Sequence, residues 1–281
     1  SDMTITPDEL RAMIPTNNEV DTWCEELNKA LPKYDINTPQ RIASFISQCA
    51  HESRDFTALE ENLNYSEGAL NRVFGRYFGE GKRNAAEYAR NPEKIANYVY
   101  MDEYRSKRGA LGNTQPGDGW RFRGKGLKQL TGRNNVTGFA NDYDMTPEEA
   151  SDWLETKEGA LASALWFWDT NNLNAIADTG DVKATTKRIN GGDIGLADRQ
   201  SRYNVAMQAL TGDIPPRAAV TQTLRVGSKG DGVKQMQAKL GIVSDGVFGP
   251  GTAKAVKAWQ EANGLTPDGV IGPKSLAIMF A

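Results

Sequence analysis

The chain repeatedly carries the residue pair that starts an α-helix, a capping Thr or Asn followed at once by proline. Such pairs occur at Thr6-Pro7, Thr38-Pro39, Asn91-Pro92 and Thr146-Pro147. Proline suits the first helical position because its φ is already helical and its missing N–H would have no partner there. Apolar residues follow at helical spacing, and strand signals are nearly absent before residue 212 apart from a short pairing expected near 120–131. The sequence therefore predicts a mainly α protein.

The predicted helices fill most of the first 211 residues. They are expected at 7–14, 18–31, 39–54, 66–78, 84–90, 92–99, 146–156, 158–169, 181–189 and 196–211. Between residues 103 and 126 the chain is instead rich in glycine, arginine and turn residues. A long irregular stretch inside a compact domain is usually functional or mobile. A second glycine-rich turn, 189–199, leads into the last of these helices.

The C-terminal part of the chain contains an internal repeat. The hexapeptide Asp245–Pro250 (DGVFGP) recurs as Asp268–Pro273 (DGVIGP), and each copy is followed by a helical pattern. Tight turns that lead into short helices predict a small pseudo-symmetric three-helix module, in which the Asp-Gly pairs serve the turns. A run rich in Pro, Thr and Ala precedes the module. We therefore divide the chain into a domain at 3–211, a linker at 212–222 and a module at 223–281.

Charge and histidine content exclude several functional classes. The net formal charge of −3 is unevenly spread, since residues 223–281 hold seven Lys/Arg and four Asp/Glu, or +3, which leaves −6 for the rest. A modest positive charge suits an anionic polymer such as a cell wall and falls far short of a nucleic-acid-binding surface. The single histidine, His51, argues against a zinc hydrolase, which takes two or three imidazole ligands. We expect no metal and no other cofactor.

Cysteine content and hydropathy add two further expectations. Cys24 and Cys49 are too few for a disulfide framework and are expected as reduced core thiols, although a bridge between two packed helices stays open. The sequence has no run of about 18 apolar residues, which predicts no stable membrane insertion. No standard secretory signal is visible at the N-terminus.

The stretch Ala43–Tyr65 carries the best candidates for catalysis. Apolar residues recur at helical spacing from Ile42 on, so one helix face should point into a core. Glu52 falls on the shoulder of that face and His51 on its far side. Partial burial favours the protonated form of a carboxyl group, as a general acid near neutral pH requires. Glu61 lies past the expected helix end, where it can face Glu52 across a cleft; a surface helix with ordinary acidic residues is the alternative.

Four ordered motifs resemble the catalytic domain of glycoside hydrolase family 19, and more narrowly the chitinase-like lysozymes of bacteriophage endolysins. They are AHES (50–53), ENLNYS (61–66), GDGWRFRGKGLKQLTGRNN (117–135) and INGG (189–192). The resemblance spans about residues 5–211. Residues 223–281 are similar to the peptidoglycan-binding domain type 1. The fold implied is a lysozyme-like, family 19 chitinase-like helical domain followed by a small three-helix module.

The resemblance implies an inverting glycosidase that uses two carboxylates. Glu52, which follows His51 as in the family's His-Glu motif, would be the general acid. Glu61, which opens ENLNYS, would be the general base. We expect the adjacent Glu60 to be a solvent-facing residue at a helix end. Thr131 would hold the attacking water together with Glu61, since a hydroxyl both donates and accepts hydrogen bonds.

The resemblance also implies a set of substrate-binding residues. Gln129 would bond a sugar amide or hydroxyl, Asn190 would present its amide to the N-acetyl sugar, and Tyr65 would line the cleft. His51 would be an orienting hydrogen-bond partner. The structural alternatives are turn or strand packing for Gln129 and for Thr131, a turn cap for Asn190 and a core position for Tyr65. Lys125 stands where the family's GRG has arginine, which keeps the charge but loses the bidentate fork.

Together these features predict a two-domain peptidoglycan hydrolase of the endolysin type. The substrate implied is the β-1,4-linked glycan of alternating N-acetylglucosamine and N-acetylmuramic acid. Its partner would be peptidoglycan and not nucleic acid, and the protein would be a monomer. The resemblance further implies release from the cytoplasm of a host bacterium, through a membrane lesion, to the cell wall. The alternatives are a chitinase on the same fold, a lytic transglycosylase and a catalytically inactive wall-binding protein.

Overall fold

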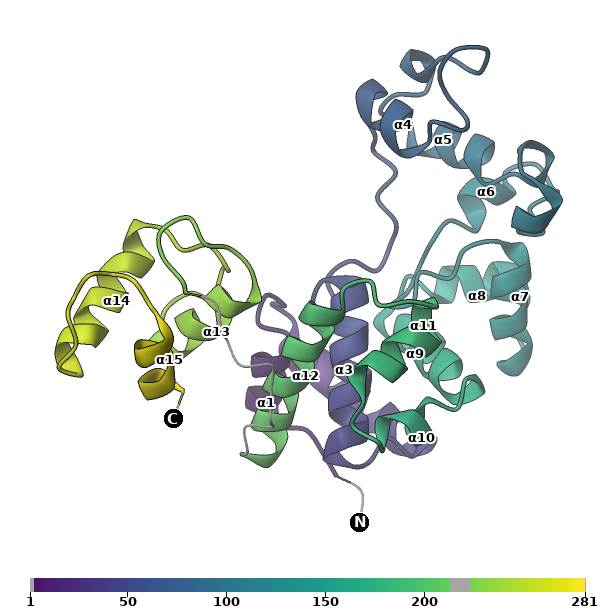
Figure 1. The fold of residues 1–281 in the computed structure, drawn as a ribbon. Helices are drawn as coiled ribbons and strands as arrows, with labels where there is room; N and C mark the ends of the chain where they lie inside the picture. The colour runs from purple at the N-terminus through teal and green to yellow at the C-terminus, as the bar shows by residue number, and fades with distance from the viewer. Residues whose placement is uncertain (1–2, 213–222, 281) are drawn as a thin grey trace. The chain divides into compact units, whose positions relative to one another are not determined.

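The computed structural model describes residues 3–212 and 223–280 and divides the chain into two compact units, Ser1–Asp213 and Ile214–Ala281 (Figure 1). The linker predicted at 212–222 lies, from residue 213 on, outside the described residues. Both units are helical, and β-pairing within the described ranges is limited to isolated bridges. The prediction of a mainly α protein is confirmed.

Nine of the twelve α-helices described in the first unit lie close to predicted positions. The twelve are α1 (Pro7–Met13), α2 (Val20–Ala30), α3 (Pro39–Ser53), α4 (Glu67–Val73), α5 (Pro92–Val99), α6 (Asp118–Arg121), α7 (Arg133–Asp142), α8 (Pro147–Trp153), α9 (Lys157–Thr170), α10 (Leu173–Ala177), α11 (Val182–Asn190) and α12 (Leu196–Thr211). Short 3₁₀ turns occur at Leu31–Tyr34, Ala85–Glu87, Asp102–Tyr104 and Lys107–Gly109.

The Thr-Pro and Asn-Pro pairs do start helices. At α1, α3, α5 and α8 the capping side chain accepts a hydrogen bond from the third helical N–H. At α1 the cap is reciprocal, because Glu9 also accepts a hydrogen bond from the N–H of Thr6 at 2.8 Å. Thr146 and Glu149 form the same arrangement at α8. Each such cap contributes about 1 kcal/mol to stability.

Some predicted boundaries were wrong. The helix expected at 84–90 is only the 3₁₀ turn Ala85–Glu87, and the helix expected at 66–78 ends at Val73. Helices α6, α7 and α10 were not predicted. Helix α7 follows Gly132, which offers no side-chain cap, and only three of its residues are buried. Tertiary packing against α8 stabilises α7 in place of local signals.

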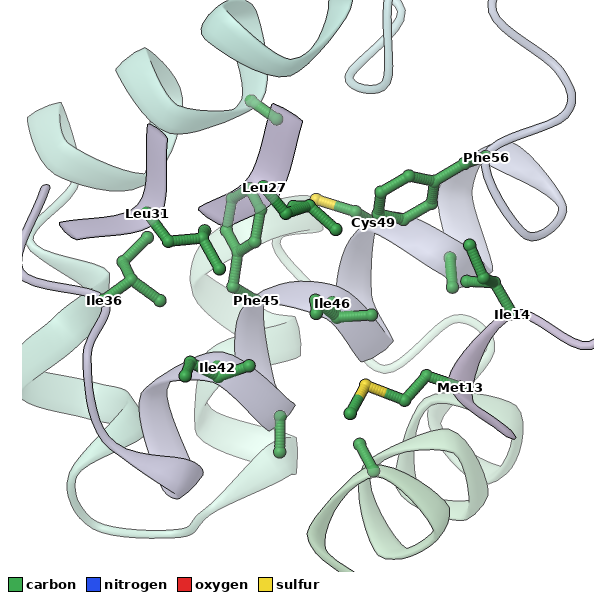
Figure 2. Packing of buried hydrophobic residues seen from close by; sticks show 14 of the residues in the cluster. Met13, Ile14, Leu27, Leu31, Ile36, Ile42, Phe45, Ile46, Cys49 and Phe56 are labelled. Atoms are coloured by element: carbon green, nitrogen blue, oxygen red, sulfur yellow. The ribbon is translucent and has the colours of Figure 1, made fainter. Parts of the chain in front are cut away.

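The apolar face of α3 lies in the largest core of the first unit (Figure 2). Phe45, Ile46 and Cys49 are buried as the helical spacing predicts, and α12 packs along α3. Phe45 meets the ring of Trp168 from α9 edge to face at 5.3 Å. Cys49 and Cys24 are separate buried thiols. Burial of one large apolar side chain contributes about 1.5–3 kcal/mol, so this face holds the end of α3 firmly in place.

The second unit repeats one hydrogen-bonded turn. Its helices are α13 (Asp231–Leu240), α14 (Pro250–Ala262) and α15 (Pro273–Met279). Gln237 Nε2 donates to Asp245 Oδ1 at 2.9 Å, and one repeat later Gln260 Nε2 donates to Asp268 Oδ1 at 3.1 Å. Each Asp also accepts the N–H two residues on, and the intervening glycine has a φ of 76° or 77°. The Asp-Gly pairs therefore serve the turns, as predicted.

Candidate active site

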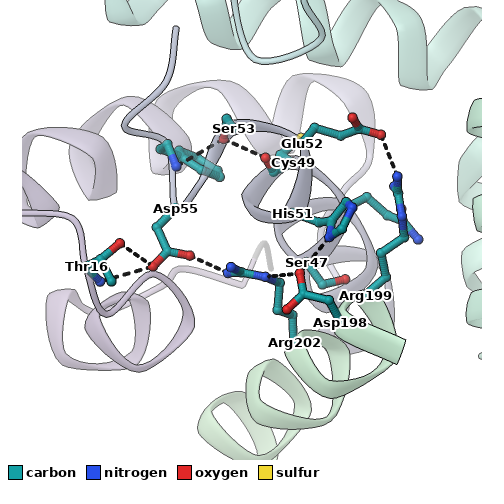
Figure 3. A network of polar contacts seen from close by, with 12 residues as sticks. Thr16, Ser47, Cys49, His51, Glu52, Ser53, Asp55, Asp198, Arg199 and Arg202 are labelled. Atoms are coloured by element: carbon teal, nitrogen blue, oxygen red, sulfur yellow. Dashed lines mark hydrogen bonds and ion pairs between the residues drawn. The ribbon is translucent and has the colours of Figure 1, made fainter. Parts of the chain in front are cut away.

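Glu52 lies in the last turn of α3, at the edge of the buried face. Its side chain is 30% exposed. Arg199 of α12 donates from Nη2 to Glu52 Oε1 at 2.8 Å (Figure 3). The same guanidinium donates to Gln48 Oε1 at 2.5 Å, and its side chain is only 2% exposed. This buried guanidinium fixes the direction of the Glu52 carboxylate.

His51 bonds to α12 and not to its neighbour Glu52. Its Nδ1 lies 2.6 Å from Asp198 Oδ2, which also accepts a hydrogen bond from Arg202 Nε at 2.8 Å (Figure 3). Consecutive residues of α12, Asp198 and Arg199, therefore hold consecutive residues of α3. This contact ties the helix end that carries the candidate acid to α12.

Glu61 lies in the extended segment after α3, where it pairs with Gly124. The N–H of Glu61 donates to Gly124 O at 2.8 Å, and the N–H of Gly124 donates to Glu61 Oε2 at 3.2 Å. The Tyr100 hydroxyl donates to Oε1, so each carboxylate oxygen has a donor. Burial, and then the charge of Glu61, raises the pKa of Tyr100, which keeps its hydroxyl protonated. The same two causes raise the pKa of Tyr65, so Tyr65 also lies within electrostatic reach of Glu61.

Three candidate side chains converge on Gly124. A Cβ atom built on this glycine would lie 3.0 Å from Gln129 Oε1, 3.1 Å from Thr131 Oγ1 and 3.3 Å from Glu61 Oε2. We refer to Glu61, Gln129 and Thr131 as the Gly124 trio. Gln129 reaches this place from a left-handed backbone conformation, with a φ of 54°. A residue with φ > 0 that is not glycine is uncommon, and such strain is often found at functional sites.

The turn at 125–130 lies near both candidate carboxylates. Backbone hydrogen bonds of 3.0 and 3.3 Å close the turn. Within it the ammonium of Lys128 is close enough to Glu52 for the charge of that carboxylate to act on it. The next residue, Gln129, belongs to the trio around Glu61. One short turn therefore borders both groups.

Asn190 shares a hydrogen-bond acceptor with Arg199, the residue that bonds to Glu52. It is exposed at the end of α11, where its Oδ1 accepts the N–H of Gly192 at 2.8 Å, as a turn cap does. Its Nδ2 donates to Ile194 O at 3.5 Å, and the same carbonyl accepts Arg199 Nε at 3.1 Å. Within the described ranges no recorded hydrogen bond joins Asn190 to the trio.

Sequence similarity decides the family. A segment of 174 residues is 37% identical to a glycosyl hydrolase family 19 domain-containing protein of Haemophilus influenzae, and the match covers 61% of this chain and 80% of that protein. The chain belongs to glycoside hydrolase family 19. Residues 229–279 match the family of peptidoglycan-binding domains, so the second unit is the binding module.

Solved structures share the fold of the family 19 domain. Chitinase C from Streptomyces griseus HUT6037 superposes with a TM-score of 0.50 at 16% identity, over 75% of this chain and 94% of that chain. A bacterial family 19 chitinase gives a TM-score of 0.50 at 14% identity, over 75% and 97% of the two chains. At these identities the similarity concerns the fold alone.

The prediction that Glu60 lies at a helix end was wrong, because α3 ends at Ser53. The backbone of Glu60 forms an isolated bridge with Lys125, and Arg123 Nε donates to its Oε1 at 2.6 Å. Its side chain is 48% exposed. Lys125, which stands where the family's motif has arginine, is buried and pairs with Glu155 at 3.3 Å.

The sequence did not reveal Arg199, Tyr100 or Lys128. Arg199 had one weak signal, a charged residue in the first turn of the helix that follows the INGG turn, and Tyr100 had none. In the described part of the chain no group of three or more His, Cys, Asp or Glu side chains is arranged to hold a metal ion. No described helix is both long and apolar enough to cross a membrane.

Proposed function

We propose that the chain hydrolyses the β-1,4-linked glycan of bacterial peptidoglycan by an inverting two-carboxylate mechanism. The proposal rests on the 125–130 turn, in which Lys128 lies within electrostatic reach of Glu52 and Gln129 lies close to Glu61 at Gly124. The peptidoglycan-binding module in the same chain supports the wall as the substrate. Such a module raises the local concentration of the catalytic domain on the polymer.

In the proposed reaction Glu52 is the general acid and Glu61 the general base. Water attacks the anomeric carbon and gives its proton to Glu61, while Glu52 gives its proton to the leaving glycosidic oxygen. Thr131 Oγ1 lies beside Glu61 and would help to hold the water. Tyr100 and the N–H of Gly124 fix both oxygens of Glu61. Arg199 would stabilise Glu52 once its proton has left.

The remaining residues would bind the sugars. Gln129 would bond an amide or hydroxyl from within the trio, Asn190 would contact an N-acetyl group from the turn before α12, and Tyr65 would line the site near Glu61. His51 would orient the end of α3. In its biological role the protein would be a monomeric phage endolysin that leaves the host cytoplasm through a membrane lesion and lyses the cell from within.

A chitinase on the same fold is the second candidate function. The solved structures of similar fold include chitinases, which supports it at the level of the fold. The wall-binding module favours peptidoglycan instead. A catalytically inactive wall-binding protein is a weaker alternative, because both carboxylates and the hydroxyl of Thr131 are present.

Product stereochemistry tests the mechanism. Soluble peptidoglycan strands would be cleaved in an NMR tube and the first anomer followed before mutarotation, with the α-anomer expected from inversion of a β-linkage. Glu52→Gln should lower kcat by at least about a hundredfold, because a general acid contributes about 10²–10⁴-fold. Glu60→Gln is the matched control and should keep most of the activity. A β-anomer as first product would contradict inversion, and an active Glu52→Gln protein would contradict the role of Glu52.

A further inference from the structure

A second cation lies beside Glu52, and the proposed mechanism does not use it. Lys128 is partly buried in the 125–130 turn, and its Nζ lies 4.1 Å from the centre of the Phe167 ring. In the part of the chain that the structure describes, no carboxylate lies at ion-pair distance from this ammonium and no acceptor bonds to it. Glu52 and Cys49 act on it only through longer-range electrostatics.

Lys125, in the same turn, shows how a structural lysine is accommodated in this fold. Its Nζ donates to Ser151 Oγ at 2.9 Å and pairs with Glu155 at 3.3 Å. A buried ammonium is costly unless such partners surround it. Burial lowers the pKa of Lys128, with the charge of Glu52 opposing that effect, yet among the described residues this ammonium has no comparable hydrogen-bond or ion-pair partners. The donors of Lys128 are therefore available to a group from outside the chain.

The charges around Glu52 indicate the sign of that group. Arg199 already bonds to the Glu52 carboxylate, and its guanidinium is held by the protein on other sides as well. Lys128 adds a second positive charge near the same carboxylate. Lys128 has no ion pair of its own among the described residues, so a negatively charged substituent on the substrate would complement its ammonium.

We propose that Lys128 binds a carboxylate carried by the muramic acid residues of the substrate, and so favours anionic peptidoglycan strands over neutral glycans such as chitin. This inference rests on the proposed function. The carboxylate has two possible sources with the same chemistry, the lactyl group of a strand without peptide and the stem peptide of an intact strand. A charge-assisted hydrogen bond of this kind is lost when the ammonium is removed.

The test compares substrates that differ only in charge. Intact strands and peptide-free strands would each be assayed with free carboxylates and with the carboxylates amidated. Lys128→Met should lower kcat/KM by about tenfold to a hundredfold on strands with free carboxylates and by less than about twofold on amidated strands. Lys128→Arg should retain part of the preference for strands with free carboxylates over amidated strands. Lys29→Met, which removes an exposed lysine of α2, is the matched control. It should leave kcat/KM unchanged on both kinds of strand.

The outcomes separate this inference from the function on which it rests. A loss confined to peptide-free strands identifies the lactyl carboxylate, and a loss confined to intact strands identifies the stem peptide. An equal loss on charged and amidated strands would mean that Lys128 acts only through Glu52, and no loss on any strand would mean that it has no role; either result overturns the inference alone. A wild-type protein that cleaves no peptidoglycan strand would overturn the proposed function and the inference with it.

Discussion

Replacing Gly124 with alanine should disable the candidate base without unfolding the domain. The added methyl carbon would lie 3.0–3.3 Å from one oxygen of each member of the Gly124 trio. These distances are shorter than ordinary van der Waals contact, so each side chain must move by a few tenths of an ångström. The backbone itself accepts alanine, because Gly124 is not among the glycines with positive φ.

The expected loss of activity follows from that displacement. A misplacement of about 1 Å in a catalytic arrangement can cost about a hundredfold in rate. A shift of a few tenths of an ångström in Glu61, Gln129 and Thr131 together should lower kcat by about tenfold to a hundredfold. Stability should change little, because the reduced entropy of the unfolded chain contributes about 0.4–1 kcal/mol and offsets part of the crowding.

The assay is the release of reducing ends from soluble peptidoglycan, with Tm recorded in parallel. Gly138→Ala in α7 is the matched control, since its methyl group would lie 3.8 Å from the Trp166 ring, an ordinary contact. That variant should be fully active and slightly more stable, because alanine is favoured over glycine inside a helix by about 1 kcal/mol. A Gly124→Ala protein with wild-type activity would refute the convergence of the trio on the reacting water.

Three further predictions concern charge and hydrogen bonding. Arg199→Gln should abolish most activity and lower the free energy of unfolding by about 3 kcal/mol, as measured by denaturant titration, because it breaks the buried pair with Glu52. Tyr100→Phe should lower kcat by about tenfold in the reducing-end assay with little change in Tm; an unchanged kcat would exclude a role for that hydroxyl. The N–H two residues on holds the pKa of Asp245 and of Asp268 below the usual value. Their contribution to module stability is therefore complete above about pH 4 and is lost as the pH falls through the folded-state pKa. The double Asn variant should weaken this acid dependence of Tm, and an identical pH profile would contradict it.

The parts of the fold that were predictable are those with local signals. Thr6 and Thr38 cap helices next to proline, and the apolar spacing around Phe45 predicts the buried face of α3. These signals act over a few residues and need no tertiary partner. Helix α7 has no such cap and depends on packing against α8, so no local pattern predicts it.

The same distinction applies to the candidate site. Glu52 and Glu61 were identified as candidates from residue type and motif. The residues that orient them come from elsewhere in the chain, since Arg199 is 147 residues from Glu52 and Tyr100 is 39 residues from Glu61. No local pattern specifies such a pairing. The left-handed conformation of Gln129 is likewise set by the tertiary fold, because an isolated glutamine disfavours it.

The proposed activity of this family 19 protein is cleavage of the glycan of the bacterial cell wall. Its most direct test is to incubate the protein with purified peptidoglycan and to count new reducing sugar ends against new free amino groups. We expect new reducing ends without new amino groups, and a yield of reducing ends about a hundredfold smaller from Glu52→Gln. New amino groups without reducing ends would mean that the protein cuts peptide bonds, and would contradict the account.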